Sequence, residues 1–112
     1  MKTKILLIGE DLNLQRTRAM LLSEWETTIV HLQDVEQAFS TQRYQLIILC
    51  QSVAESTARE IIAQAKVRQP EAKMVAVSRV GEDRQLGVPG YHVDLNDPHG
   101  FVDAVAELLA PS

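Results

Sequence analysis

Short runs of apolar residues recur along the chain, separated by segments whose apolar residues have a helical spacing. The strand-like runs, apolar or rich in β-branched residues, are Ile5–Ile8, Thr27–Leu32, Gln45–Cys50, Lys73–Ser78 and, more weakly, Tyr91–Val93. Runs this short and this continuously apolar are typical of strands that are buried on both faces. The pattern therefore predicts a sheet of five strands with a covering layer on each side.

Amphipathic helices are predicted in the first three intervals between these strands and again after the fifth strand. They are expected at 13–24 with Asn13 as cap, from Asp34 to Thr41, from the capping box Ser52–Glu55 to Arg68, and from Asp97-Pro98 to Leu109. Polar caps before apolar periodic segments are the usual start signals of helices. Helices thus alternate with strands along almost the whole chain.

The first predicted helix carries apolar residues at helical spacing. Leu14, Leu21, Leu22 and Trp25 are expected to face the sheet. The segment Gln15–Arg18, which contains two arginines, is expected to form the solvent-exposed side of the same helix.

The alternation of strands and helices predicts an α/β fold with one domain over residues 1–112. We expect a flavodoxin-like, doubly wound, five-stranded parallel sheet with the strand order 2-1-3-4-5. In this order the topological switch point lies between the first and third strands. The residues that end these two strands, Gly9-Glu10-Asp11 and Cys50, should therefore lie at one crevice.

The composition is that of an ordinary globular domain and excludes several function classes. Apolar residues make up 46% and charged residues 23%, and the net charge of −4 gives no electrostatic reason for contact with nucleic acid or an anionic membrane. A single cysteine excludes an internal disulfide and a multi-cysteine zinc site. No apolar stretch approaches the length of a membrane span, so we expect a cytoplasmic protein.

Four segments near the strand ends resemble those of one signalling family. The chain resembles the receiver domain of response regulators from Lys4 to Leu109, through "KILLIGED" at 4–11, "YQLIILC" at 44–50, "AKMVAVS" at 72–78 and "GYHVDL" at 90–95. In that family an acidic pair after the first strand helps to hold Mg²⁺, and an Asp at the end of the third strand accepts a phosphoryl group. A Ser or Thr ends the fourth strand, and a Lys followed by Pro ends the fifth. The resemblance thus implies a phosphorylation pocket at the switch point.

The chain departs from this pattern at most of the positions that carry the chemistry. The family positions fall on Gly9 and Glu10 with Asp11 adjacent, on Cys50 for the phosphoacceptor, on Ser78, and on Asp94 and Leu95 for the Lys-Pro pair. A thiol is a poor ligand for Mg²⁺, and Asp94 reverses a charge where phosphate negativity would accumulate. We therefore expect a degenerate member, a pseudo-receiver that is not phosphorylated on aspartate, is not an enzyme, and holds no cofactor or functional metal.

Two other functions stay open. Cys50 could serve as a redox-active or phosphoryl-accepting thiol, although a buried structural cysteine is favoured. The loop Gln51–Glu55 contains no glycine, and Ser56 stands where a Cys-x5-Arg phosphatase loop needs its arginine. Alternatively, the crevice at Glu10, Ser78 and Asp94 could bind a small ligand.

The interval between the fourth and fifth strands has little room for a helix. Receivers place their fourth helix here, but Arg79–Gly90 contains three glycines and a proline, so at most one turn at Glu82–Leu86 is expected. The family's fourth helix is thus predicted to be shortened or missing. We expect a reshaped interaction face that includes Arg79, Leu86 and Tyr91.

The expected activity is protein–protein interaction in a two-component or phosphorelay system. The expected partner is a histidine kinase, another regulator, an output domain or a second copy of the chain. Direct contact with nucleic acid or with a membrane is not expected.

Overall fold

The computed structural model of the 112-residue chain describes residues 3–79, 86–93 and 98–110, without the side chains of Arg79, His92 and Val93. Its elements are β1 (Lys4–Gly9), α1 (Leu12–Leu21), β2 (Glu26–His31), the 3-10 turn η1 (Leu32–Asp34), α2 (Val35–Thr41), β3 (Leu46–Leu49), α3 (Glu55–Arg68), β4 (Lys73–Arg79), β5 (Gly90–Val93) and α4 (Pro98–Leu109). All five predicted strands and the four predicted helices are present, with ends shifted by a few residues.

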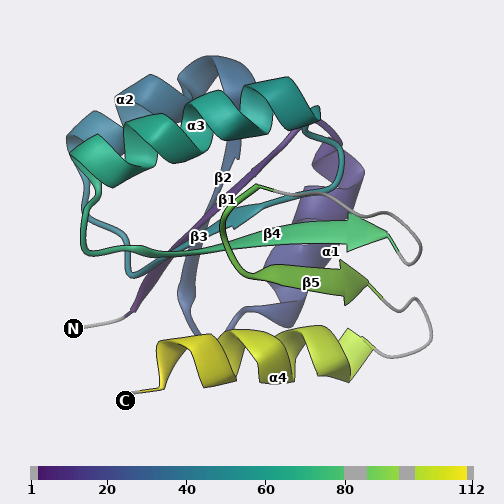
Figure 1. Ribbon diagram of the computed structural model, residues 1–112. Helices are drawn as coiled ribbons and strands as arrows, with labels where there is room; N and C mark the ends of the chain where they lie inside the picture. Colours follow the sequence, from purple (N-terminus) through teal and green to yellow (C-terminus); the bar gives the residue numbers. More distant parts are fainter. Residues whose placement is uncertain (1–2, 80–85, 94–97, 111–112) are drawn as a thin grey trace.

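The five strands form one parallel sheet in the order β2-β1-β3-β4-β5. Helices α2 and α3 cover one face of this sheet, and α1 and α4 cover the other (Figure 1). The predicted α/β fold and strand order are therefore confirmed. The carboxyl ends of the strands lie on the side of Figure 1 toward which β4 and β5 point.

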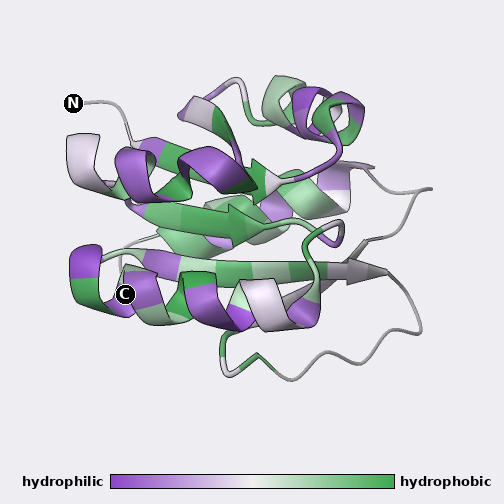
Figure 2. Ribbon diagram, turned by 90° about the horizontal axis from the view of Figure 1, so that it is seen from above, coloured by the Kyte–Doolittle hydropathy of each residue, from purple (hydrophilic) through white to green (hydrophobic). Residues whose placement is uncertain are grey.

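Alternate residues of each strand supply two separate hydrophobic cores. Leu6, Ile8, Ile47 and Leu49 face α2 and α3, and together with those helices they form the α2/α3 core. Their neighbours face the opposite way and form the α1/α4 core; they are Ile5, Leu7, Leu46, Ile48 and Cys50. Figure 2 shows the hydrophobic strands of the sheet between helices of mixed polarity. Burial on both faces explains why these strands are continuously apolar.

The side of helix α1 that faces the sheet is not the predicted side. Gln15 and Arg18 are only 2% and 4% exposed, and Leu22 at the end of the helix is fully buried. These three residues follow one another at helical spacing and define the side that faces the sheet and α4. The prediction that Gln15–Arg18 faces solvent is therefore wrong for two of its residues, because long-range partners, and not the leucine pattern, determine the rotation of the helix. The buried Gln15 amide donates from Nε2 to the carbonyl oxygens of Leu7 and Val30, both at 3.2 Å.

Two predicted caps also differ from the structure. Helix α1 is capped by Asp11, whose Oδ1 accepts a hydrogen bond from the Leu14 backbone N–H at 3.2 Å, and Asn13 lies inside the helix. Helix α3 starts after Ala54 without a side-chain cap. Ser52 does not form the predicted capping box, because its Oγ accepts a hydrogen bond from the backbone N–H of Glu10 at 2.9 Å. The predicted cap Asp97 lies outside the described residues.

The interval between β4 and β5 is described only from Leu86 onward. Residues 86–89 form no helix, and Gly87 adopts a positive φ of 75° that favours glycine. The predicted turn at Glu82–Leu86 falls mostly on 80–85, outside the described residues. In the part of the chain that the structure describes, no helix is long and apolar enough to cross a membrane.

Candidate functional site

The ends of β1 and β3 meet at one edge of the sheet, as the strand order predicts. Ile8 pairs with Leu49, and the backbone N–H of Cys50 donates to the carbonyl oxygen of Ile8 at 2.9 Å. The hydrogen bond from the Glu10 N–H to Ser52 joins the two following loops. Gly9, Glu10 and Cys50 are therefore brought together, with Glu10 exposed to solvent.

Gly9 is closely surrounded by the residues of this edge. A Cβ atom built on Gly9 would lie 3.1 Å from the Cβ of Cys50 and 3.1 Å from the Oγ of Ser52. It would also lie 3.3 Å from the Cδ of Gln15. There is therefore no room for a carboxylate at this position without a shift of its neighbours.

Cys50 is a core residue and not an open nucleophile. It has no exposed surface and packs in the α1/α4 core. Burial raises the pKa of the Cys50 thiol, and the charge of Asp11 acts in the same direction. The nearby Arg18 guanidinium acts in the opposite direction. A buried thiol with a raised pKa has the properties of a structural cysteine.

Arg18 is a part of this site that the sequence pattern missed. Its guanidinium lies near the Cys50 thiol, with Cζ 5.8 Å from the ring centre of Phe101 on α4. Its Nη1 and Nη2 atoms are buried, and neither has a hydrogen-bond partner of normal geometry among the described residues. Because arginine on an amphipathic helix is usually exposed, the helical periodicity of the sequence did not indicate that Arg18 is buried.

Ser78 is buried on β4, but strand alternation separates it from Cys50. Val75 and Val77 belong to the α1/α4 core and Ala76 to the α2/α3 core. Ser78 continues this alternation toward the α2/α3 side, whereas Cys50 faces α1 and α4. Alternation thus directs the two side chains to opposite faces of the sheet, and their grouping in one pocket at the strand ends stays a prediction.

The residues of the predicted interaction face differ in their surroundings. Leu86 is 6% exposed in the α2/α3 core, so its side chain does not contribute to an exposed face. Tyr91 is partly buried and packs on Phe101, with ring centres 5.8 Å apart. The side chain of Arg79 lies outside the described part of the structure.

The remaining predicted pocket residue, Asp94, lies outside the described residues, as does Leu95. Asp11 is exposed and caps α1. Within 3–79, 86–93 and 98–110, no three His, Cys, Asp or Glu side chains are grouped so that they could hold a metal ion.

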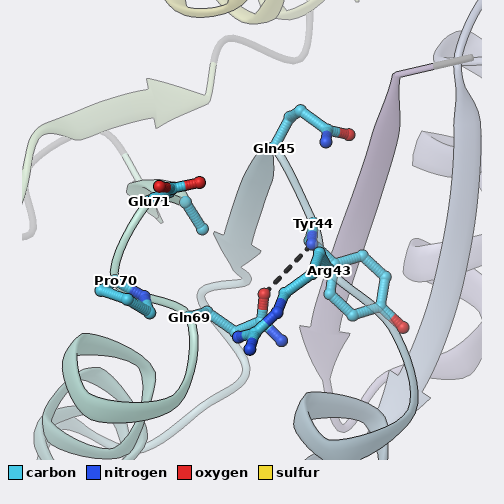
Figure 3. Close-up of a pocket in the computed structure, with 7 residues that line it drawn as sticks. Arg43, Tyr44, Gln45, Gln69, Pro70 and Glu71 are labelled. Atoms are coloured by element: carbon cyan, nitrogen blue, oxygen red, sulfur yellow. Dashed lines mark hydrogen bonds between the residues drawn. The ribbon is translucent and has the colours of Figure 1, made fainter. Parts of the chain in front are cut away.

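A cavity of about 330 Å³ lies at the opposite edge of the sheet, before β3 and β4 (Figure 3). Its lining residues are Arg43, Tyr44, Gln45, Gln69, Pro70, Glu71 and Ala72. The buried Gln69 side chain accepts from the Tyr44 N–H at 3.1 Å and donates to the carbonyls of Phe39 at 2.9 Å and Gln42 at 2.7 Å. These bonds join the ends of α2 and α3, so this amide is structural. No sequence motif distinguished Gln69.

Comparison of the sequence with protein-family models and with curated proteins finds no match. Solved structures are similar in fold. A CheY-like receiver domain protein from Methanospirillum hungatei superposes with a TM-score of 0.79 at 14% identity, over 97% of this chain and 94% of that one. The chemotaxis response regulator CheY4 of Vibrio cholerae gives 0.79 at 11% identity, over 97% and 100%.

A third similar structure is that of the histidine kinase ThkA in complex with the response regulator protein TrrA. The TM-score is 0.75 at 17% identity, and the match covers 96% of this chain and 99% of the matched chain. At these identities the likeness establishes a common fold. This chain has the flavodoxin-like fold of response regulator receiver domains.

Proposed function

We propose that this chain is a receiver-fold signalling module that is not phosphorylated on aspartate and acts through protein–protein contact. The observation that carries the proposal is the buried Cys50 at the end of β3, the place of the phosphoacceptor in receivers. A thiol there removes the hard oxygen ligand that Mg²⁺ prefers.

The packing of Gly9 supports the same proposal. Receivers need carboxylates after the first strand to hold Mg²⁺, but the space next to Gly9 is filled by Cys50, Ser52 and Gln15. The position thus lacks a carboxylate, and its neighbours are closely packed, as expected where residues serve packing and do not bind a metal ion.

The proposed partner is a protein of a two-component system. The ThkA–TrrA structure is a complex between a histidine kinase and a response regulator, and it supports a kinase as one candidate class for this chain. Another regulator, an output domain or a second copy of the chain are the other candidates. A receiver fold that lacks its phosphoacceptor would bind its partner constitutively.

The test is incubation of the purified protein with acetyl phosphate and Mg²⁺, followed by intact mass measurement. A phosphorylatable receiver domain serves as the positive control. We expect no phosphoryl adduct on this chain. A stable acyl phosphate on any carboxylate of the strand-end edge would overturn the proposal.

The thiol-based alternative is tested separately by alkylation of Cys50 in the folded and the urea-unfolded protein. Because the side chain has no exposed surface, we expect modification only after unfolding. Rapid modification of the folded protein would instead favour a reactive thiol.

A further inference from the structure

Arg18 is a buried cation whose charge the described structure does not neutralise. The side chain is 4% exposed, and both terminal nitrogens are inaccessible. Neither nitrogen has a hydrogen-bond partner within 3–79, 86–93 and 98–110, and Arg18 forms no ion pair with any residue in these ranges. A buried charge without a partner is costly, so an arginine in this state requires an explanation.

The groups around Arg18 compensate its charge only weakly. The ring of Phe101 lies beneath the guanidinium at 5.8 Å, a distance at which a cation–π contact is modest. The thiol of Cys50 is neutral when its pKa is raised, and the Asp11 carboxylate is used at the start of α1, where it accepts from Leu14. The Cys50 thiol is near enough to act as a weak hydrogen-bond partner of the Arg18 side chain, but no described group bonds to Nη1 or Nη2 with normal geometry.

A second buried polar atom without a partner lies on the residue that follows Cys50. The Oε1 atom of Gln51 is buried and has no hydrogen-bond partner in the described structure. Buried polar atoms in native proteins are nearly always hydrogen-bonded, so these exceptions are informative. The two Arg18 donors lack an acceptor among the described residues, whereas Gln51 Oε1 is itself an acceptor and needs a donor, so it is Arg18 that points to an anion.

We propose that Arg18 is the anchor of a binding site for a small oxyanion at the carboxyl ends of β1 and β3. With Nη1 and Nη2 both unbonded, the guanidinium presents the two-donor edge that pairs with two oxygens of a phosphate, sulfate or carboxylate group. Because both nitrogens are inaccessible, an anion reaches them only when the surrounding side chains shift, and the bound anion is then shielded from water, which strengthens the interaction.

The same arrangement disfavours a divalent cation. The guanidinium is a fixed positive charge beside Cys50, and like charges repel strongly where water is excluded. The site therefore binds its anion without metal. This inference does not depend on the proposed function: it concerns reversible binding, whereas the acetyl phosphate test detects a covalent adduct.

The experiment measures thermal unfolding of the full chain, followed by the fluorescence of Trp25, the single tryptophan. Sodium phosphate, sulfate and acetate are titrated against chloride at matched ionic strength, and Mg²⁺ is titrated separately. We expect a saturable rise in Tm with at least one oxyanion and none with chloride or Mg²⁺. The anion that acts at the lowest concentration identifies the ligand class. Absence of a saturable rise with all three oxyanions overturns the proposal.

Two matched variants assign the effect to Arg18. Arg18→Met keeps the length of the side chain and removes its charge, whereas Arg16→Met makes the same change at an exposed position of the same helix. Arg18→Met should weaken anion binding by a factor of about 10 to 100. It should also raise Tm in anion-free buffer, because it removes an unpaired buried charge. Equal anion responses of the two variants, or a lower Tm of Arg18→Met in anion-free buffer, would show that the charge is satisfied within the chain.

A second pair of variants tests the site without an added ligand. Cys50→Asp supplies a carboxylate beside Arg18 from within the chain, and Cys50→Asn is the uncharged control of equal size. If the guanidinium lacks an anion, Cys50→Asp should have the higher Tm at neutral pH and should lose the response to phosphate. A lower Tm of Cys50→Asp than of Cys50→Asn would contradict the proposed site.

Discussion

At the scale of single residues, Gly9 shows how the strand-end edge is filled. Gly9→Ala introduces a Cβ atom at 3.1 Å from both the Cys50 Cβ and the Ser52 Oγ. We expect a loss of about 1–3 kcal/mol in the free energy of unfolding, because close-packed neighbours must move. Urea denaturation measures this change.

Gly90 provides the control for this substitution. A Cβ atom built on Gly90 would meet its nearest neighbour, the Ala76 carbonyl oxygen, at an ordinary 3.7 Å. Gly90→Ala should therefore change the stability by no more than about 0.5 kcal/mol. Equal losses of unfolding free energy in Gly9→Ala and Gly90→Ala would show that close packing around Gly9 does not cause the destabilisation.

Cys50 gives a prediction for the pH dependence of stability. Burial raises the pKa of its thiol in the folded protein above the ordinary value of 9.0. The folded state therefore retains the thiol proton in a range where the unfolded chain has lost it. The contribution to stability is complete below pH 9.0 and decreases as the pH rises from there toward the folded pKa.

The measurement compares wild type with Cys50→Ala by urea denaturation from pH 7 to pH 10.5. Above about pH 9 the wild type should lose stability more steeply, by at most about 1.4 kcal/mol per pH unit. Parallel pH profiles of the two proteins would mean that the thiol titrates normally in the folded state.

At the scale of the elements, the Gln69 amide connects the ends of α2 and α3 to the segment before β3. Gln69→Leu leaves the Tyr44 N–H and the carbonyls of Phe39 and Gln42 without this partner. We expect a loss of about 3 kcal/mol or more in the free energy of unfolding. Gln64→Leu, an exposed change on the same helix, should have little effect. A similarly small effect of Gln69→Leu would mean that water replaces these hydrogen bonds.

At the scale of the whole molecule, one sheet is shared by two cores. Ile62→Ala removes a side chain from the α2/α3 core and Leu22→Ala one from the α1/α4 core. Each should cost about 2–5 kcal/mol. Because both cores pack on the same strands, the fluorescence of Trp25 and far-UV circular dichroism should report one common transition in each variant.

Val67 provides the control for the core substitutions. It is 80% exposed on α3, so Val67→Ala should change the stability by about 0.5 kcal/mol or less. Separate transitions in fluorescence and circular dichroism would contradict a shared cooperative unit.

The sequence by itself determined the strands and their parallel order. It also determined that Gly9, Glu10 and Cys50 meet at one edge of the sheet. Continuous apolar runs indicate strands that are buried on both faces of a sheet. The alternation of strands with helices restricts the order in which the strands can pair. Since the carboxyl ends of parallel strands share an edge, the location of the candidate site followed from the fold.

Only the tertiary structure decided how polar and buried groups are used. Residues distant in the sequence determine that the side chains of Gln15 and Arg18 are buried. They also determine that Ser52 accepts a hydrogen bond from Glu10 and that Leu86 lies in the α2/α3 core. Helical periodicity and capping motifs describe only neighbours along the chain, so they assign polar residues to solvent or to the nearest helix end. Gln15 is buried where the assembled fold supplies its hydrogen-bond partners, whereas the described residues supply none for the Arg18 terminal nitrogens, and the proposed partner there is an anion.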